Sequence, residues 1–269
     1  MAEKPIIPIR RLGIESLTQS TGVLVLPEST VHHFRVLRLG VGSKVRLLDG
    51  RGYRADGVVL STRKNAVVCE LTSVKYTPRP ARRVVLVQAV PKGSKLEIVV
   101  RMTAELGVHA IYLAASERSV PRVKRERSFE KTERLRRIAQ EACVQSDQPY
   151  CPEVREPAYL LEAAGGAPEE AIRLVFWEHS TEELDSVLSR FTRPASRTNK
   201  DEEVWAVVGP EGGFSTTEIE SLHRLGYRDI GLGPSLMRVE TAAPLIVGLI
   251  LDRLGRFGFE YPPEQLPFL

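Results

Sequence analysis

Two short stretches decide the fold of this chain, VVGPEGGFS at residues 207–215 and LGPSLMRVETA at residues 232–242. Each begins with apolar residues typical of a strand, breaks into a turn rich in glycine and proline, and runs toward a helix. Two such turns close in sequence can bring their loops together at one edge of a sheet, where open α/β sheets bind their ligands. The sequence therefore predicts an α/β fold with a ligand site at these loops.

Size and composition limit the class of protein. The 269 residues are enough for one large or two modest domains, and no apolar run has the length needed to span a bilayer. The N-terminus lacks the basic flank and apolar block of a secretory signal. Cys69, Cys143 and Cys151 are odd in number and widely spaced, which argues against disulfides and against a zinc site. We expect a cytoplasmic protein without bound metal or membrane contact.

Charge is distributed unevenly along the chain. Residues 1–83 carry fifteen Lys/Arg and six Asp/Glu, a balance of +9, whereas the remainder carries a balance of −5 within a net charge of +4. A basic N-terminal third is typical of a module that binds a polyanion such as RNA. A basic surface that is merely solvated explains the charge equally well.

The N-terminal part has the pattern of a small β-barrel. Short strand-like runs separated by turns occur at residues 22–26, 44–50, 53–60 and 66–71. The segment at residues 76–83 contains two prolines and resembles a linker, because proline resists both helix and central strand. Beyond it the pattern changes, and we predict one domain at residues 1–78 and a second at residues 79–269.

The second part alternates strands and helices, which predicts βαβ units. Ser94 and Glu97, like Ser215 and Glu218, have the spacing of a capping box at a helix start. Glycines at positions 107 and 226 are placed to end those two helices. Further strands are predicted at residues 84–90, 110–114, 171–177 and 203–208, and further helices at residues 125–146 and 239–254; residues 192–202 are predicted to form a polar loop.

The glycines of the first stretch allow close approach of the backbone to a ligand, because no Cβ intervenes. Exposed N–H groups in such a turn can bind anionic or carbonyl groups. The spacing matches neither a P-loop nor a dinucleotide-binding fingerprint. A tight turn with a helix cap is the alternative interpretation.

Arg238 and Glu240 are charged residues in an otherwise small and apolar segment at a helix start. The helix dipole favours Glu240 there, so a plain capping role is an alternative for it. Arg238 has no such explanation, and a guanidinium beside a glycine-rich turn is suited to stabilise developing negative charge.

Together these residues resemble the signature of the ribosomal RNA small subunit methyltransferase E family, the 16S ribosomal RNA uridine N3-methyltransferases of the SPOUT superfamily. Further segments are similar to the family pattern, namely HFRVLR at residues 33–38, ELGV at 105–108, SERS at 116–119 and EACVQS at 141–146. Immediately after EACVQS the chain departs from the family pattern: the family usually continues with Gly-Arg, and this chain has Asp147-Gln148. The departure predicts an altered RNA contact, or a nearby arginine in that role.

The resemblance implies an N-terminal PUA-like β-barrel that binds RNA and a C-terminal α/β domain with a deep trefoil knot. It also implies a homodimer that holds S-adenosylmethionine (SAM) in the knot loops. Carried onto this sequence, the cofactor-binding residues are Phe176, Trp177, Glu178, Gly209, Pro210, Glu211, Gly212, Gly213, Leu232, Gly233, Ser235, Leu236, Met237, Arg238, Thr241 and Ala242.

The implied reaction methylates N3 of a uridine in 16S ribosomal RNA of the small ribosomal subunit. A carboxylate must accept the N3 proton and a cation must stabilise the resulting anion, and Glu240 and Arg238 are the candidates for these roles. The candidates for RNA binding are Arg10, Arg11, His33, Arg35 and Arg38. Two alternatives stay open: a SPOUT methyltransferase acting on another ribosomal or transfer RNA position, and a non-catalytic RNA-binding ribosome-assembly factor.

Overall fold

The computed structural model describes residues 6–8, 22–26, 28–119, 125–189 and 202–256. Contacts divide the chain into two compact units. The first comprises residues 1–80 and 133–153, and the second comprises residues 81–132 and 154–269. Residues 133–153 thus return to the N-terminal unit, although they lie far along the chain.

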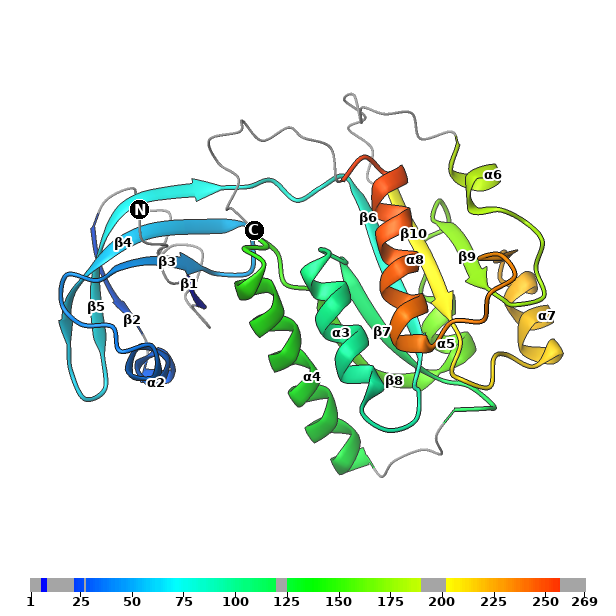
Figure 1. Cartoon of the computed structure of the whole chain (residues 1–269), viewed down its shortest axis with the longest axis horizontal. Helices are drawn as coiled ribbons and strands as arrows, with labels where there is room; N and C mark the ends of the chain where they lie inside the picture. The colour runs from blue at the N-terminus through cyan, green and yellow to red at the C-terminus, as the bar shows by residue number, and fades with distance from the viewer. Residues whose placement is uncertain (1–5, 9–21, 27, 120–124, 190–201, 257–269) are drawn as a thin grey trace. The chain divides into compact units, whose positions relative to one another are not determined.

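The first unit is built on a five-stranded sheet with the order β1-β3-β4-β5-β2 (Figure 1). All neighbouring pairs are antiparallel except β1 and β3, which are parallel. The four strands predicted in this region are present, and β1 is an addition that the sequence pattern did not indicate. The strands are β1 (Ile6–Pro8), β2 (Gly22–Leu26), β3 (Lys44–Leu48), β4 (Tyr53–Thr62) and β5 (Val67–Tyr76).

Alternation along the strands forms the core of this unit. In β2, Leu24 and Leu26 are buried while Val23 and Val25 point to solvent, as the period of two requires. The helix α2 (Glu28–Val36) contributes Phe34 to the same core cluster. In β2 one face is therefore buried in the core and the other is exposed.

The helix α4 (Arg125–Gln145) ends in this unit with a Schellman-type turn. The N–H of Gln148 donates to the carbonyl of Cys143 at 2.9 Å, and Asp147 has the left-handed φ of 51° that such a turn requires. Glycine is usual at this position because it has no Cβ to clash. The departure from the family pattern therefore places an aspartate where the backbone favours glycine.

The carboxylate of Asp147 connects the helix end to the sheet. Its Oδ2 accepts hydrogen bonds from Nη1 of Arg46 at 3.0 Å and from Nη1 of Arg54 at 3.1 Å. Arg46 also donates through Nε to Asp56 at 2.9 Å. Burial lowers the pKa of Arg46, but Asp56 and Asp147 outweigh that effect and raise it. Two arginines of the basic third are thus paired within the protein.

The second unit is built on a six-stranded sheet with the order β11-β9-β10-β6-β7-β8. The pairings from β11 through β7 are parallel, which confirms the α/β class and the parallel sheet. Val84 to Ala89 are all buried, as expected for a strand covered on both faces. The strands are β6 (Arg82–Ala89), β7 (Ala110–Ala115), β8 (Glu153–Tyr159), β9 (Ile172–Phe176), β10 (Glu202–Val208) and β11 (Arg228–Ile230).

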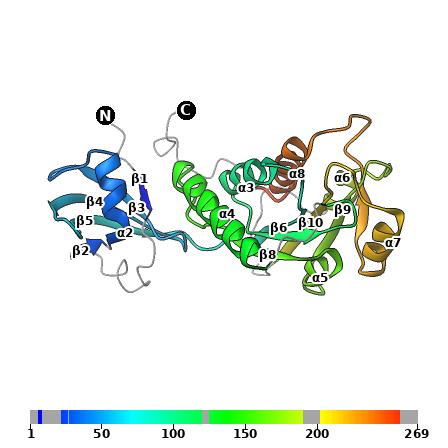
Figure 2. The same cartoon turned by 90° about the horizontal axis from the view of Figure 1, so that it is seen from below.

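Helices cover both faces of this sheet. Figure 2 shows α3 and α8 on one face and α5 on the other. The helix α8 packs on β6, β10 and α3, whereas α5 packs on β6, β7 and α7. The helices are α3 (Lys95–Glu105), α5 (Leu160–Gly165), α6 (Leu184–Leu188), α7 (Thr216–Arg224) and α8 (Val239–Arg253).

Only one of the two predicted capping boxes is formed. At α7, the Ser215 side chain accepts from the N–H of Glu218, and the Glu218 carboxylate accepts from the N–H of Ser215. At α3 the prediction was wrong, because Ser94 has ψ near 2° instead of the extended conformation of a capping residue. There the N–H of Glu97 donates to the carbonyl of Ser94.

The sequence did not indicate β8, β11, α5 or α6; β11, α5 and α6 are short, and β8 (EVREPAY) is mostly exposed and has no run of apolar residues. The predicted loop at 192–202 lies outside the described residues except for Glu202. Across the described part of the chain, no helix combines the length and hydrophobicity needed to cross a membrane.

Replacing Asp147 with asparagine keeps the left-handed turn but removes the charge that pairs with Arg46 and Arg54. All three side chains are less than one-third exposed, so we expect a loss of about 1–2 kcal/mol in the free energy of unfolding. Urea denaturation measures it. Glu220→Gln, which removes an exposed pair with Arg224, is the control and should change stability by less than about 0.5 kcal/mol. Equal effects of the two substitutions would contradict the structural role of Asp147.

Candidate active site

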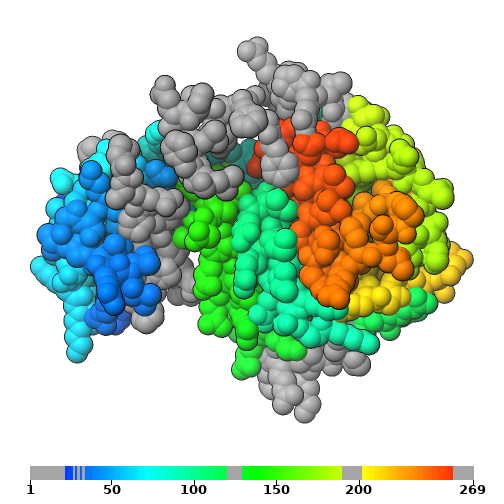
Figure 3. Space-filling model, viewed as in Figure 1, coloured from blue at the N-terminus to red at the C-terminus, as the bar shows by residue number. Residues whose placement is uncertain are grey.

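A cavity of about 680 Å³ lies where β9, β10 and β11 end. Its walls are three segments, at residues 176–179, 208–214 and 230–238, closed by Lys95 of α3 and by three residues of α8. Residues of both glycine-rich stretches, at 207–215 and 232–242, therefore line one cavity at the carboxyl edge of the sheet. In Figure 3 the loop at residues 232–238 (orange) lies at the surface beside α8 (orange to red).

Most of the residues predicted to bind the cofactor are brought together here. All of them line the cavity except Thr241, which lies one turn into α8. Arg238 also lines it, at the N-cap of α8. Its exposed guanidinium makes no hydrogen bond with any described residue. Glu240 does not line the cavity, and its Oε2 is buried without a partner among the described residues.

The glycine-rich loop after β10 is held by the side chain of Gln88 and by a turn within the loop itself. The buried side chain of Gln88 donates to the carbonyls of Ala89, Val208 and Gly209, at 2.8, 3.4 and 3.4 Å. The N–H of Gly213 closes a turn onto the carbonyl of Pro210 at 3.0 Å. These contacts fix the end of β10 to the end of β6.

Glu211, in this loop, contacts the first residue of α3 and the segment just before that helix. Lys95 Nζ lies 2.8 Å from Glu211 Oε1, and the N–H of Lys92 donates to the same carboxylate at 3.2 Å. Burial raises the pKa of Glu211, but these hydrogen bonds outweigh it and lower the pKa below its usual range. Glu211 is therefore a fixed negative charge at the cavity, poorly suited to accept a proton.

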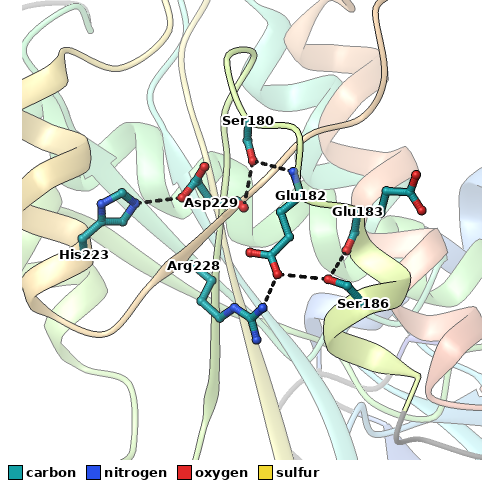
Figure 4. Close-up of polar contacts among 7 residues, drawn as sticks. All are labelled: Ser180, Glu182, Glu183, Ser186, His223, Arg228 and Asp229. Atoms are coloured by element: carbon teal, nitrogen blue, oxygen red, sulfur yellow. Dashed lines mark hydrogen bonds and ion pairs between the residues drawn. The ribbon is translucent and has the colours of Figure 1, made fainter.

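The loop after β9 is tied to β11 by a polar network (Figure 4). Ser180 Oγ donates to the carbonyl of Asp229 at 2.9 Å and accepts from the N–H of Glu182 at 3.2 Å. The Glu182 carboxylate pairs with Arg228 and accepts from Ser186 Oγ at 3.0 Å. The strand β11, which leads into the cavity segment at residues 230–238, is thus bound to the segment that follows β9.

Backbone contacts draw the same two segments together. The N–H of Trp177 donates to the carbonyl of Ile230 at 3.1 Å, and the N–H of Gly231 donates to the carbonyl of Glu182 at 2.9 Å. A Cβ at Gly231 would overlap the carbonyl oxygen of Ser180. Only glycine fits between these segments.

Several cavity residues were missed by the sequence argument. Lys95 and His179 line the cavity, as do apolar residues that include Phe214, Ile230 and Ile246. Lys95 is 116 residues away from its partner Glu211, so no local pattern could have found it. The ring of His179 packs edge-on against Trp177 at 5.1 Å between centroids, and Trp177 Nε1 is buried without a described partner.

The predicted RNA-binding residues belong to the first unit. Arg10, Arg11 and the side chain of His33 lie outside the described residues. Arg35 and Arg38 are exposed at the end of α2, and Arg35 Nη2 donates to the carbonyl of Lys64 at 3.0 Å. Arg38 adopts a left-handed φ of 52°. In the described part of the chain no group of His, Cys, Asp and Glu could hold a metal ion.

Comparison with known proteins identifies both units. An RNA methyltransferase domain family matches residues 77–251, and an RNA methyltransferase PUA domain family matches residues 26–72. A curated relative, ribosomal RNA small subunit methyltransferase E of Aquifex aeolicus, is 31% identical over 86% of this chain and 94% of its own length. The protein of the same name from Bacillus subtilis is 29% identical over 79% of this chain and 83% of its own length.

Solved structures agree in fold. A methyltransferase from Legionella pneumophila in complex with SAM superposes with a TM-score of 0.79 at 26% identity, covering 93% of this chain and 98% of that one. A ribosomal RNA small subunit methyltransferase E from Neisseria gonorrhoeae, bound to SAM, superposes with a TM-score of 0.77 at 23% identity. It covers 95% of this chain and 100% of that one, and at this identity the likeness shows the fold alone. The chain belongs to the ribosomal RNA small subunit methyltransferase E family, with an RNA methyltransferase domain preceded by a PUA domain.

Proposed function

We propose that this protein is a SAM-dependent methyltransferase that methylates N3 of a uridine in 16S ribosomal RNA of the small ribosomal subunit. The observation that carries the proposal is that the two loops with the family signature meet in one cavity. The curated relatives are named as small subunit methyltransferases, and the Legionella structure holds SAM. Because the substrate is ribosomal RNA, the protein acts in the cytoplasm.

The chemistry of the cavity fits SAM. Glycine backbone at positions 209, 212 and 213 offers close approach, and buried apolar residues such as Phe176 and Ile230 suit an adenine ring. The carboxylates of Glu178 and Glu211 suit the cationic groups of the cofactor. When bound, SAM supplies an electrophilic methyl group on a sulfonium.

Around this donor the protein's own residues prepare the uracil. N3 is a weak nucleophile while protonated, so a base must take its proton and a cation must stabilise the charge that spreads onto O2 and O4. Arg238 supplies that cation, since its unpaired guanidinium lines the cavity at the start of α8. Glu240, two residues further along the chain, is our proposed proton acceptor; its Oε2 is buried without a described partner, and its side chain lies outside the cavity lining.

RNA docking falls to the basic N-terminal domain, which we assign to residues 1–78, with the methyltransferase domain at 79–269. Arg10, Arg11, His33, Arg35 and Arg38 contact the RNA, the arginines through phosphates. Exposure of Arg35 and Arg38 at the end of α2 supports this role. The strands of this domain form a PUA-like barrel.

Two further features belong to the proposal. First, the chain is a homodimer. Exposed apolar side chains on the packed helices α3 and α8 support it, with Ile98, Met102 and Leu245 each about 40% exposed and Leu236 87% exposed nearby. Second, residues after β11 pass through the segment joining β9 to β10 as a deep trefoil knot. The close contact of residues 177–182 with β11 and Gly231 is consistent with such a passage.

The function is tested by methyl transfer from SAM to small ribosomal subunits that lack the modification. Mapping the methylated nucleoside by mass spectrometry separates N3 of a 16S uridine from another ribosomal or transfer RNA position. Calorimetry with SAM separates an enzyme from a ribosome-assembly factor that only binds RNA. No binding of SAM, or methylation at another position, would refute the proposal.

Arg238→Ala should lower kcat by about 10²- to 10³-fold, the typical effect of removing one group that stabilises a developing anion. The melting temperature should stay unchanged, because the guanidinium of Arg238 makes no hydrogen bond with a described residue. Arg224→Ala, an exposed arginine on α7, is the control and should retain full turnover. Near-normal turnover of Arg238→Ala would remove this residue from the mechanism.

Replacing Arg35 and Arg38 together with alanine should weaken RNA binding and reduce its salt dependence. Each phosphate contact contributes about one to the slope of log affinity against log salt concentration, so the slope should fall by about two. Lys75→Ala is the control. It removes an exposed cation near the end of β5, whereas Arg35 contacts Lys64, just before the start of that strand. An unchanged slope in the double variant would show that RNA docks elsewhere.

Gly231→Ala should separate the two cavity loops, because the added methyl group overlaps the Ser180 carbonyl. Overpacking of this kind costs about 1–3 kcal/mol, so SAM affinity measured by calorimetry should fall by about tenfold or more. Gly165→Ala is the control, since no atom lies within 4 Å of the added methyl group. If both variants bind SAM like the wild type, the contact at Gly231 does not shape the cavity.

A further inference from the structure

The second unit contains another cavity, also of about 680 Å³, which the function described so far does not use. It lies where the turn after β7 meets the starts of α5 and α7. No residue that lines it also lines the first cavity. A single turn, SERS at residues 116–119, forms its rim and reaches toward the first cavity.

This turn is held rigidly. The N–H of Ser119 donates to the carbonyl of Ser116 at 3.1 Å, and the two hydroxyls lie 2.8 Å apart. The N–H of Glu117 donates to Oε1 of Glu218 at 2.8 Å, while Oε2 of the same carboxylate accepts from the N–H of Ser215 at 2.9 Å. The capping box of α7 therefore also fixes the SERS turn.

Arg118, at the tip of the turn, joins the two cavities. Its Nη1 donates to the carbonyl of Gly212, in the glycine-rich loop, at 2.7 Å. A Cβ on Gly212 would lie 3.3 Å from the Cβ of Arg118, so the stem of the arginine lies against the loop. The side chain is exposed, and no other described residue accepts a hydrogen bond from it. A guanidinium carries five N–H donors, so the others are available to a ligand.

The lining of the second cavity suits a nucleobase better than a phosphate. Tyr159 and Leu161 line it with exposed fractions of 57% and 44%, which gives a ring and an aliphatic surface for stacking. Hydroxyl groups of Ser221 and Thr217 and the exposed carboxylate of Glu117 can accept hydrogen bonds from the N–H groups of a base. The carboxylate would repel a phosphate inside the cavity.

We propose that the second cavity binds the base of a nucleotide next to the methylated uridine, with Arg118 on the phosphate that joins the two. This rests on the function proposed above. A base turned out of its stack and held on an aromatic ring, with its edge read by hydrogen bonds, is how proteins recognise single-stranded RNA. The site selects the RNA sequence around the target, and it keeps that neighbour beside the cofactor loop.

The test is steady-state methyl transfer to unmodified small ribosomal subunits by Tyr159→Ala and Arg118→Ala. Both variants should raise the KM for the subunit, and Tyr159→Ala by at least about fivefold, the lower end for loss of one base–aromatic stack. Arg118→Ala should also reduce the slope of log(kcat/KM) against log salt concentration by about one, whereas Tyr159→Ala should leave the slope unchanged. A purely structural role would not produce this difference in slope.

Conservative variants and controls guard against misfolding. Tyr159→Phe keeps the ring and should restore most of the subunit affinity lost in Tyr159→Ala, while Arg118→Lys should keep the salt slope of the wild type. Arg224→Ala removes another exposed arginine of the same unit and should keep the KM of the wild type. SAM affinity of Tyr159→Ala, measured by calorimetry, should stay within twofold of the wild type.

The outcomes separate this inference from the proposed function. If the wild type neither binds SAM nor methylates the subunit, the proposed function fails. If the wild type is active and both alanine variants keep its KM, the flanking-nucleotide site is refuted while the function stands. If Arg118→Ala loses SAM affinity and keeps its salt slope, Arg118 only supports the Gly212 loop, and the phosphate contact is refuted.

Discussion

The close contact between the loop after β9 and the segment that leaves β11 is the constraint on which the cavity depends. Backbone hydrogen bonds from Trp177 and Gly231, together with the hydroxyl of Ser180, leave no room for a side chain between the two segments. Parallel pairing of β9 with both β10 and β11 delivers all three loops to the same edge of the sheet. The shape of the cavity at this edge therefore depends on the glycine at position 231 as much as on the charged side chains around it.

Charged residues at the cavity divide into fixed and available ones. Glu211 is paired with Lys95 and accepts a hydrogen bond from the N–H of Lys92, so it holds the loop in place. Arg238 and Arg118 border the site with donors that no described residue occupies, one at the start of α8 and one on the SERS turn. A site that must bind an anionic polymer and stabilise a transient anion needs available cations, whose N–H donors are not all used within the protein. Arg238 makes no side-chain hydrogen bond with a described residue, and Arg118 uses one N–H on the Gly212 carbonyl, so their remaining donors are available.

The sequence predicted the elements whose signals are local, and it failed where contacts are distant. The apolar run at 84–90 and the Ser215–Glu218 box correspond to β6 and α7. The same box spacing at Ser94 was misleading, because the backbone there does not extend and spacing alone cannot reveal that. The elements β11, α5 and α6 are too short to show a periodicity, and β8 has no run of apolar residues that would indicate a strand. Likewise, glycine-rich loops revealed the cavity, whereas Lys95 reaches it only through the fold.

Asp147 shows how the two-arginine pairing restricts variation in related sequences. Its carboxylate holds Arg46 and Arg54 together, and these two cations would repel each other without it. A lineage that changes this position to a basic residue would gather three positive charges at one point. Substitutions at 46, 54 and 147 are therefore expected to occur together among close relatives. The number of Lys and Arg residues in the N-terminal third also overstates the number available to bind RNA, since Arg46 and Arg54 are paired with Asp147.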